Sequence, residues 1–143
     1  MMKKMRIIAI VVMAIWIAGC SKKEDNSISD IGGVNDAITL GSWRVSYFWD
    51  SGKDETNHFA DYQFTFNASG ELIAASGSST VSGTWSSLDD DSILKLVISF
   101  ASPDDFTDLN DDWHIIEATA KKIRLEDVSG GGGGTDYLTF EKN

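Results

Sequence analysis

The sequence is poor in the residues that cross-link small proteins. Among 143 residues there are one cysteine, Cys20, one proline, Pro103, and two histidines. A single cysteine cannot form a disulfide within the chain, and one cysteine with two distant histidines falls short of the ligands of a structural zinc site. We therefore expect a fold that is stabilised by a hydrophobic core and not by disulfides or a metal.

The sequence also lacks an apolar run long enough for a transmembrane helix. Its apolar stretch at residues 7–18 has 12 residues, whereas a helix needs roughly 20 to cross a bilayer. This stretch follows a leader with three basic residues and no acidic ones. A short apolar core behind a positive leader is typical of a secretory signal peptide, so residues 1–19 are predicted to be a cleaved signal peptide.

The tetrapeptide Ile17-Ala18-Gly19-Cys20 resembles the lipobox of bacterial lipoproteins. The resemblance implies a diacylglycerol on the Cys20 thiol and acylation of the new amino terminus, and two or more acyl chains give stable membrane anchoring. It also implies the outer membrane, because Ser21 stands where an aspartate would signal retention in the inner membrane. The charged residues 22–25 are similar to the signal that sends some Bacteroidota lipoproteins to the cell surface, although a solvated linker would also be charged. The alternative is an ordinary signal peptide followed by a free cysteine.

Positive charge is scarce after the leader. The 12 basic residues are outnumbered by 22 acidic ones, and three of the basic residues lie in the first 19 positions. The chain from Cys20 onward therefore has nine basic and 22 acidic residues, a net charge of −13. This balance argues against nucleic acid and against anionic lipid headgroups as partners of a basic face. Contact with a membrane is expected through the lipid on Cys20.

Hydrophobic periodicity divides the remaining chain in two. Residues 20–40 show no sustained period and contain Gly32-Gly33, which predicts a lipidated flexible tether whose ends lie on the order of 25 Å apart. From Gly41 to residue 143 apolar residues alternate with polar ones, the pattern of half-buried strands. Eight strands are expected, at Trp43–Asp50, Tyr62–Phe66, Leu72–Ala75, Thr80–Trp85, Leu94–Phe100, Trp113–Ala120, Ile123–Val128 and Tyr137–Phe140.

Short connections between these strands predict an all-β fold, an antiparallel up-and-down meander that forms a small barrel. In the first strand, the alternation places Trp43, Val45, Tyr47 and Trp49 on one face. Residues 102–113 predict one short helix, with Ser102 as N-cap and Pro103 at the first helical position. Its apolar residues Phe106 and Leu109 can both face inward, as a plug at one end of the sheet.

The stretch Gly41-Ser42-Trp43 is similar to the Gly-x-Trp start of the lipocalins. The segments "FTFNASGEL", "VSGTWS" and "DYLTFEK" are spaced as in small lipocalin-like lipoproteins of Bacteroidota. The resemblance covers residues 41–143 and implies a lipocalin-like barrel. Lipocalins usually pack a basic residue from late in the chain over the first Trp, and Arg124 is a possible counterpart for Trp43 through a cation–π contact.

Two interpretations of the aromatic residues remain open. They can line a pocket for a small apolar or sugar-like ligand, or they can fill the barrel, since the interior of eight strands is about the size of its own side chains. The first predicts a membrane-anchored lipoprotein that binds a small apolar ligand or an envelope component, and the second a structural or interaction module with a filled core. The candidate ligand-binding residues are Trp43, Tyr47, Tyr62, Phe64, Trp85, Phe106 and Trp113.

No motif in the sequence predicts catalysis, a metal or a cofactor. Asp108, Asn110 and Asp112 have the spacing of a calcium loop, but Trp113 stands where its glycine should be and Thr119 where its glutamate should be. No Gly-x-Ser-x-Gly elbow accompanies the two histidines. A hydrolase that uses carboxylates is the third interpretation, with no pair of acids that stands out from the general acidity.

Overall fold

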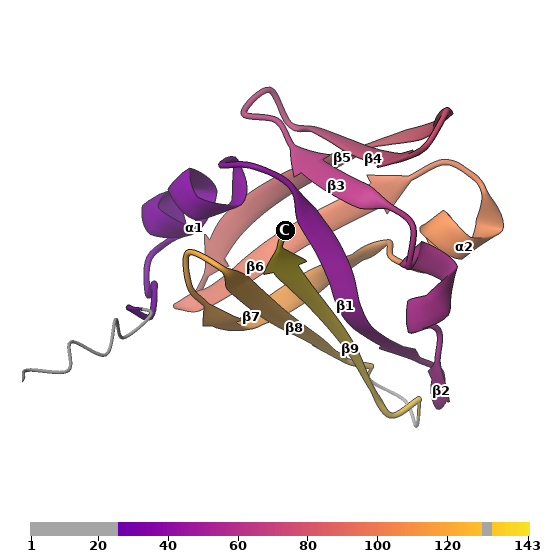
Figure 1. Ribbon diagram of the computed structural model, residues 1–143. Coiled ribbons are helices and arrows are strands. Elements are labelled where there is room, and N and C mark those ends of the chain that lie inside the picture. The colour runs from indigo at the N-terminus through magenta and orange to yellow at the C-terminus, as the bar shows by residue number, and fades with distance from the viewer. Residues whose placement is uncertain (1–25, 130–132) are drawn as a thin grey trace, which may run out of the picture.

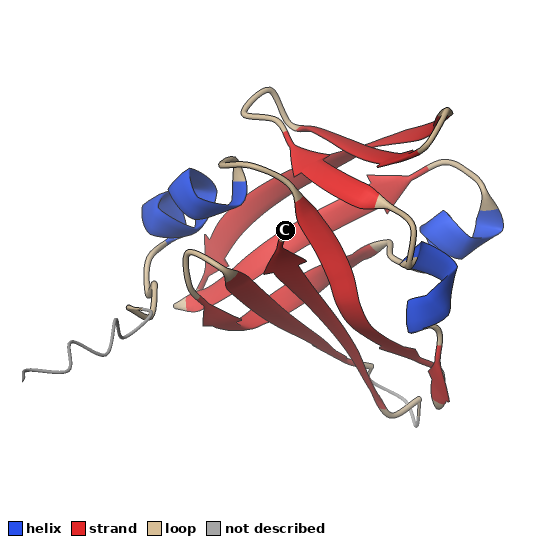
Figure 2. Ribbon diagram, viewed as in Figure 1, coloured by secondary structure: helices blue, strands red, loops and turns tan. Residues whose placement is uncertain are grey.

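The computed structural model describes residues 26–129 and 133–143, so the predicted signal peptide and Cys20 lie outside the described residues. A barrel of antiparallel strands has helices at both ends (Figure 1, Figure 2). The helices are α1 (Ile31–Ile38), the 3-10 helix η1 (Thr56–Phe59) and α2 (Asp104–Thr107). The strands are β1 (Trp43–Asp50), β2 (Lys53–Asp54), β3 (Gln63–Phe66), β4 (Glu71–Ser76), β5 (Ser79–Asp90), β6 (Ile93–Phe100), β7 (Asp111–Ala118), β8 (Lys122–Val128) and β9 (Thr135–Lys142).

The barrel closes between its first and last strands. Strands β3 to β9 pair antiparallel with their neighbours in chain order, and β9 pairs with β1. This arrangement confirms the predicted all-β up-and-down barrel of eight strands, with the two-residue β2 paired to the end of β1. Strands β1 and β3 share a single residue pair, Trp43 with Phe64, and Phe59 and Phe106 pack beside this seam against Phe64.

A bulge in β1 overturns the predicted face of its second half. The register with β9 shifts between Val45 and Tyr47, and one extra residue in a strand moves every later side chain to the opposite face. Trp43 and Val45 point inward as expected, but Phe48 is the next buried residue and Tyr47 is 39% exposed. The prediction that Trp43, Val45, Tyr47 and Trp49 share one face is therefore wrong.

Helix α1 shows that the folded unit begins before Gly41. Asp30 is its N-cap and accepts a hydrogen bond from the backbone of Gly33. Val34 and Ile38 are fully buried in the barrel core. Upstream of the helix, the Ile28 backbone N–H donates to the Ala118 carbonyl at 2.7 Å. The prediction of a flexible tether through residue 40 is therefore wrong for Ile28 onward, because burial of an apolar face offsets the low helix propensity of two glycines.

The opposite end of the barrel has the predicted plug. Helix α2 begins one residue later than expected, with Pro103 as the N-cap position instead of Ser102. Phe106 and Leu109 both point inward and are buried, as the spacing predicted. The 3-10 helix η1, which the sequence did not predict, adds the buried ring of Phe59 to the same end.

Candidate functional site

Six of the seven candidate ligand-binding residues belong to the core of the barrel. Trp43, Phe64, Phe106 and Trp113 are at most 2% exposed, Trp85 is 9% exposed, and Tyr62 is partly buried against the core. Tyr47, the seventh, points outward because of the bulge in β1. The interior positions are thus occupied by the candidate residues themselves.

The interior rings contact one another from end to end. At the plugged end, Phe106 lies 5.0–5.2 Å from the ring centroids of Phe59, Tyr62 and Phe100 in edge-on contacts. Toward the α1 end, Phe140 lies 5.3–5.4 Å from Phe64 and Phe66. Edge-to-face aromatic pairs at such distances stabilise beyond their burial alone, so this lattice of rings acts as a packed core.

Trp43 is held from two sides at the α1 end. Its indole N–H donates to the Ile38 carbonyl at 2.8 Å. The Lys142 ammonium lies 5.1 Å from the centroid of the Trp43 ring, within the range of a cation–π contact. The late basic residue that the lipocalin resemblance led us to expect is therefore Lys142 on the last strand. The assignment to Arg124 is wrong, since Arg124 instead pairs with Glu117 at 3.1 Å.

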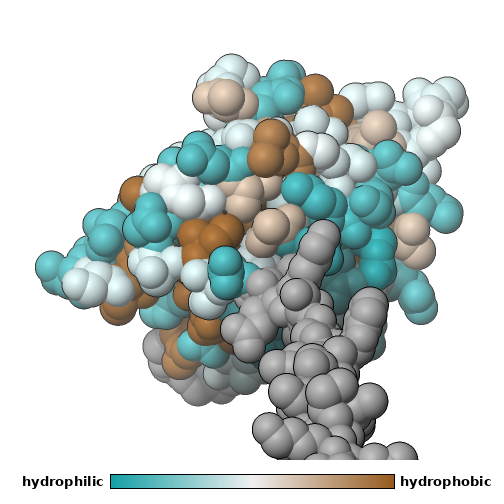
Figure 3. Space-filling view, turned by 60° about the vertical axis from the view of Figure 1, so that its left-hand side comes forward, coloured by the Kyte–Doolittle hydropathy of each residue, from teal (hydrophilic) through white to brown (hydrophobic). Residues whose placement is uncertain are grey.

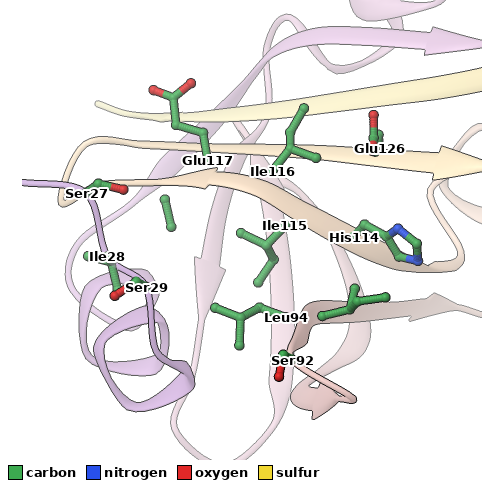
Figure 4. Close-up of a pocket in the computed structure, with 12 residues that line it drawn as sticks. Ser27, Ile28, Ser29, Ser92, Leu94, His114, Ile115, Ile116, Glu117 and Glu126 are labelled. Atoms are coloured by element: carbon green, nitrogen blue, oxygen red, sulfur yellow. The ribbon is translucent and has the colours of Figure 1, made fainter.

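An open groove lies outside the barrel wall, beside β7. It has a volume of about 410 Å³, which is within the usual range of roughly 300–1,000 Å³ for small-molecule sites. Its apolar lining includes Leu94 and Ile115, whose side chains lie close together, and Ile28 on the other side beside Ser29 (Figure 4). The remaining lining residues are Ser27, Ser29, Ser92, Ile93, His114, Ile116, Glu117, Ala118 and Glu126.

The groove exists because β6 and β7 separate. Their pairing ends at Lys95 with His114, although β7 continues to Ala118. The segment before α1 pairs with the far end of β7 through Ile28 and Ala118. Between these two contacts, the half-buried Leu94 and Ile115 pack against the core and also face the groove. Viewed toward the α1 end, hydrophobic side chains reach the surface in several places between hydrophilic ones (Figure 3).

A second bulge sets the rim of this groove. The register between β7 and β8 shifts between Ile115 and Glu117. As a result, Ile116 and Glu117 both project away from the apolar floor (Figure 4), and Ile116 is 42% exposed. In a regular strand these two neighbours would point to opposite faces, so an outward Glu117 would require an inward Ile116. The bulge removes this requirement, and Glu117 pairs with Arg124 at the surface.

Carboxylates gather at the plugged end of the barrel. Burial raises the pKa of Asp50 above its ordinary value, and the charge of Asp136 raises it further. Burial likewise raises the pKa of Asp111, with an added contribution from Asp127. Each carboxyl is thus affected by its own neighbours, which indicates electrostatic repulsion at this end and not a shared acid–base pair.

His58 lies between two of the acids at this end. Its Nε2 is 3.0 Å from a carboxylate oxygen of Glu55, and its Nδ1 is 3.3 Å from one of Asp105. Such contacts orient an imidazole, but neither includes a hydroxyl or thiol that it could activate. Within residues 26–129 and 133–143, no group of three or more His, Cys, Asp or Glu side chains is arranged to hold a metal ion.

No protein-family model and no curated protein matches the sequence. The fold is similar to that of a DUF4847 family protein from Bacteroides vulgatus ATCC 8482, solved by crystallography at 1.00 Å resolution. The TM-score is 0.53 at 18% sequence identity, over 78% of this chain and 98% of that chain. The two proteins share a small β-barrel fold. Among the described residues, no helix is both long and apolar enough to cross a bilayer.

The groove is the part of the site that sequence reasoning missed. Ile28 fell in the presumed tether, and Leu94 and Ile115 fit an ordinary strand alternation. Nothing in a local pattern indicates that the first two residues of β6, Ile93 and Leu94, are not paired with β7. The one signal present was the apolar pair Ile115-Ile116, which breaks the alternation of β7.

Proposed function

We propose that this protein is a non-catalytic binding module of the cell envelope, whose filled barrel is a scaffold and whose groove beside β7 binds a small apolar ligand. The observation that carries the proposal is that the apolar residues Ile28, Leu94 and Ile115 line one open space of about 410 Å³. Apolar floors with a few polar groups at the rim are typical of small-molecule sites. Here the rim offers His114, Glu126 and Ser92.

The alternative, a structural or interaction module without a ligand, is favoured by the packed interior. Rings of the candidate residues occupy the space that a ligand of a larger lipocalin-like barrel would use. The two functions differ in one measurable property, because only the first predicts saturable binding of an apolar molecule.

Substitution of Ile93 by Glu is expected to weaken the binding of an apolar molecule by tenfold or more. Ile93 lines the groove and is 45% exposed, so a carboxylate there is tolerated by the fold but desolvated by the ligand. The measurement is a titration with the neutral fluorescent probe N-phenyl-1-naphthylamine, followed by competition with a panel of fatty acids and sterols. The matched control is Val128→Glu, a 58% exposed apolar residue at the end of β8, which should bind as the wild type does.

If Ile93→Glu binds the probe as tightly as the wild type does, the groove is not the binding site. A wild type that binds neither the probe nor any competitor would leave the structural or interaction module. Melting curves of all three proteins, recorded in parallel, separate lost binding from lost folding.

We further propose that Cys20 carries the lipid and tethers the module to the outer membrane, with exposure at the cell surface as one of its two possible orientations. The support is the coincidence of charged leader, apolar core and lipobox in residues 1–20. Ile28 follows Cys20 by eight positions, a distance of at most about 26–29 Å when the chain is extended. The tether is thus much shorter than the one predicted at residues 20–40, and it would hold the α1 end of the barrel and the groove near the membrane.

Radioactive palmitate is expected to label the wild-type protein in its host and not the Cys20→Ala variant, because the thiol is the attachment atom. Detergent phase partitioning should show the same difference. Equal labelling of the two proteins would contradict lipidation, and an unlabelled wild type would leave an ordinary signal peptide with a free cysteine.

A further inference from the structure

Three aromatic side chains lie on the outside of the barrel, and all three are neighbours. Residues 26–129 and 133–143 contain 14 aromatic residues, and eleven of them belong to the core or pack against it. The other three are Tyr47 and Trp49 on β1 and Tyr137 on β9. We infer that these three residues, called the aromatic platform below, form a second binding site that takes a neutral carbohydrate chain.

The register of the sheet brings the three rings together. Trp49 is directly opposite Tyr137, and Tyr47 is opposite Thr139. Adjacent strands lie about 4.8 Å apart, and residues two apart on one strand are separated by about 7 Å. Strands β1 and β9 run side by side along the barrel (Figure 1). The rings therefore occupy one continuous area on the outer face of two strands.

The alternation of buried residues fixes the outward direction of this area. Phe48, between the two β1 members, is 1% exposed, and Leu138, next to Tyr137, is fully buried. Side chains adjacent in a strand point to opposite faces, so the platform residues face outward. The bulge between Val45 and Tyr47 is what turns Tyr47 and Trp49 to that side.

The side-chain polar atoms of the platform have no hydrogen-bond partner among the described residues. The three interior indoles, those of Trp43, Trp85 and Trp113, each donate to a backbone carbonyl at 2.8–2.9 Å. Neither the indole N–H of Trp49 nor the hydroxyls of Tyr47 and Tyr137 make such a bond to a described residue. Trp and Tyr usually find hydrogen-bond partners for these groups when they are buried. On the platform the groups face outward without such partners, so two hydroxyls and one N–H can bond to a ligand.

Positive and negative charges beside the platform are nearly balanced. Outward-facing residues on β1, β7, β8 and β9 form the ion pairs Arg44–Glu141, Lys122–Glu141 and Arg124–Glu117. Two further carboxylates are Glu126, opposite Tyr137, and Asp54, opposite Trp49, so three cations lie beside four carboxylates. From Cys20 onward the chain has nine basic and 22 acidic residues, so an area with three cations and four carboxylates is much less acidic than the chain as a whole. A neutral ligand fits it better than a phosphate or an acidic polymer does.

A sugar chain has the chemistry that the platform can recognise. The flat face of an aromatic ring packs on the C–H face of a pyranose, and the unpaired hydroxyls and N–H can hydrogen-bond to the sugar hydroxyls. The carboxylate of Glu126 and the guanidinium group of Arg124 can contact adjacent sugar hydroxyls from the side. A sheet face gives a broad contact area, which suits successive residues of a polymer. Trp, Tyr and Arg are also enriched at protein–protein interfaces. A protein partner is therefore the alternative ligand, and the experiment below distinguishes it from a polysaccharide.

Affinity electrophoresis of the purified full chain in neutral detergent tests the inference. Native gels contain one soluble polysaccharide each: hydroxyethyl cellulose, xylan, galactomannan, dextran or soluble starch as neutral polymers, and alginate as an anionic one. At least one neutral polysaccharide should slow the wild type relative to a polysaccharide-free gel. Trp49→Ala should migrate as in the polysaccharide-free gel, and Tyr137→Phe should lose part of the retardation because only the hydroxyl is removed.

The matched control is Leu40→Ala, which removes a 62% exposed apolar side chain away from the platform and should be retarded as the wild type is. The groove variant Ile93→Glu should also be retarded, so the platform and the groove are tested separately. If Trp49→Ala melts far below the wild type, Tyr47→Ala replaces it, since Tyr47 is 39% exposed. Three results would each overturn the inference: retardation by alginate alone, equal retardation of the wild type and the platform variants, or no retardation by any polysaccharide. The last of these would leave a protein as the partner of this face.

Discussion

A chain that begins at Gly41 is expected to lose about 3–6 kcal/mol of its free energy of unfolding relative to a chain that begins at Asn26, since full burial of one aliphatic side chain contributes about 1.5–3 kcal/mol. The shorter chain lacks Val34 and Ile38, which are both fully buried in the barrel core. It also lacks the Ile38 carbonyl, which accepts the indole N–H of Trp43. A buried N–H without an acceptor adds to the loss.

Urea unfolding of both chains, followed by tryptophan fluorescence, measures this difference. Whole domains are stable by only about 5–15 kcal/mol, so the chain from Gly41 should unfold at much lower urea or fail to fold. The variant Ile38→Ala in the longer chain should show part of the loss. Coincident unfolding curves for the two chains would contradict the assignment of α1 to the folded unit.

Replacement of Phe106 by Ala is expected to lower the free energy of unfolding by about 3–5 kcal/mol, the usual cost of truncating a buried aromatic residue. Phe106 is 2% exposed and sits on a helix of four residues, α2, so few backbone contacts can compensate for the missing ring. Its ring contacts those of Phe64 on β3, Phe100 on β6, Phe59 on η1 and Tyr62 just before β3. The cavity would lie where β1 and β3 share only one residue pair.

Thermal and urea unfolding measure the effect, with Tyr47→Ala as the control. Tyr47 lies outside the barrel, so its truncation should change stability by no more than about 0.5 kcal/mol, as for most surface substitutions. Comparison of the two unfolding free energies shows whether the ring in the plug contributes to stability and the ring on the outer platform does not. A Phe106→Ala protein as stable as Tyr47→Ala would show that α2 does not complete the core.

Local period-two patterning was sufficient for the strands that lack bulges. In β6, Leu96, Ile98 and Phe100 are buried as predicted, and Val97 lies on the other side. The spacing of Phe106 and Leu109 likewise predicted the inward plug. These features depend only on residues close in sequence, because the side-chain directions of a strand or a helical turn repeat with a fixed period.

The bulges could not be predicted from the same patterns. Whether Tyr47 or Phe48 points inward depends on how β1 pairs with β9, which is nearly 100 residues away. The same holds for Ile116 and Glu117, whose directions depend on the pairing of β7 with β8. Because one inserted residue reverses the faces of a strand, the aromatic platform and the groove rim were both assigned only by the tertiary structure.

By itself, then, the sequence determined the class of the fold, its strand order and the aromatic content of its core, since alternation and turn residues act locally. It also contained the signal features around Cys20. Only the tertiary structure decided that residues 28–38 belong to the folded unit, because the burial of Val34 and Ile38 comes from strands distant in sequence. Closure of the barrel also selected Lys142 and not Arg124 as the partner of Trp43, because pairing of β9 with β1 places Lys142 opposite Trp43.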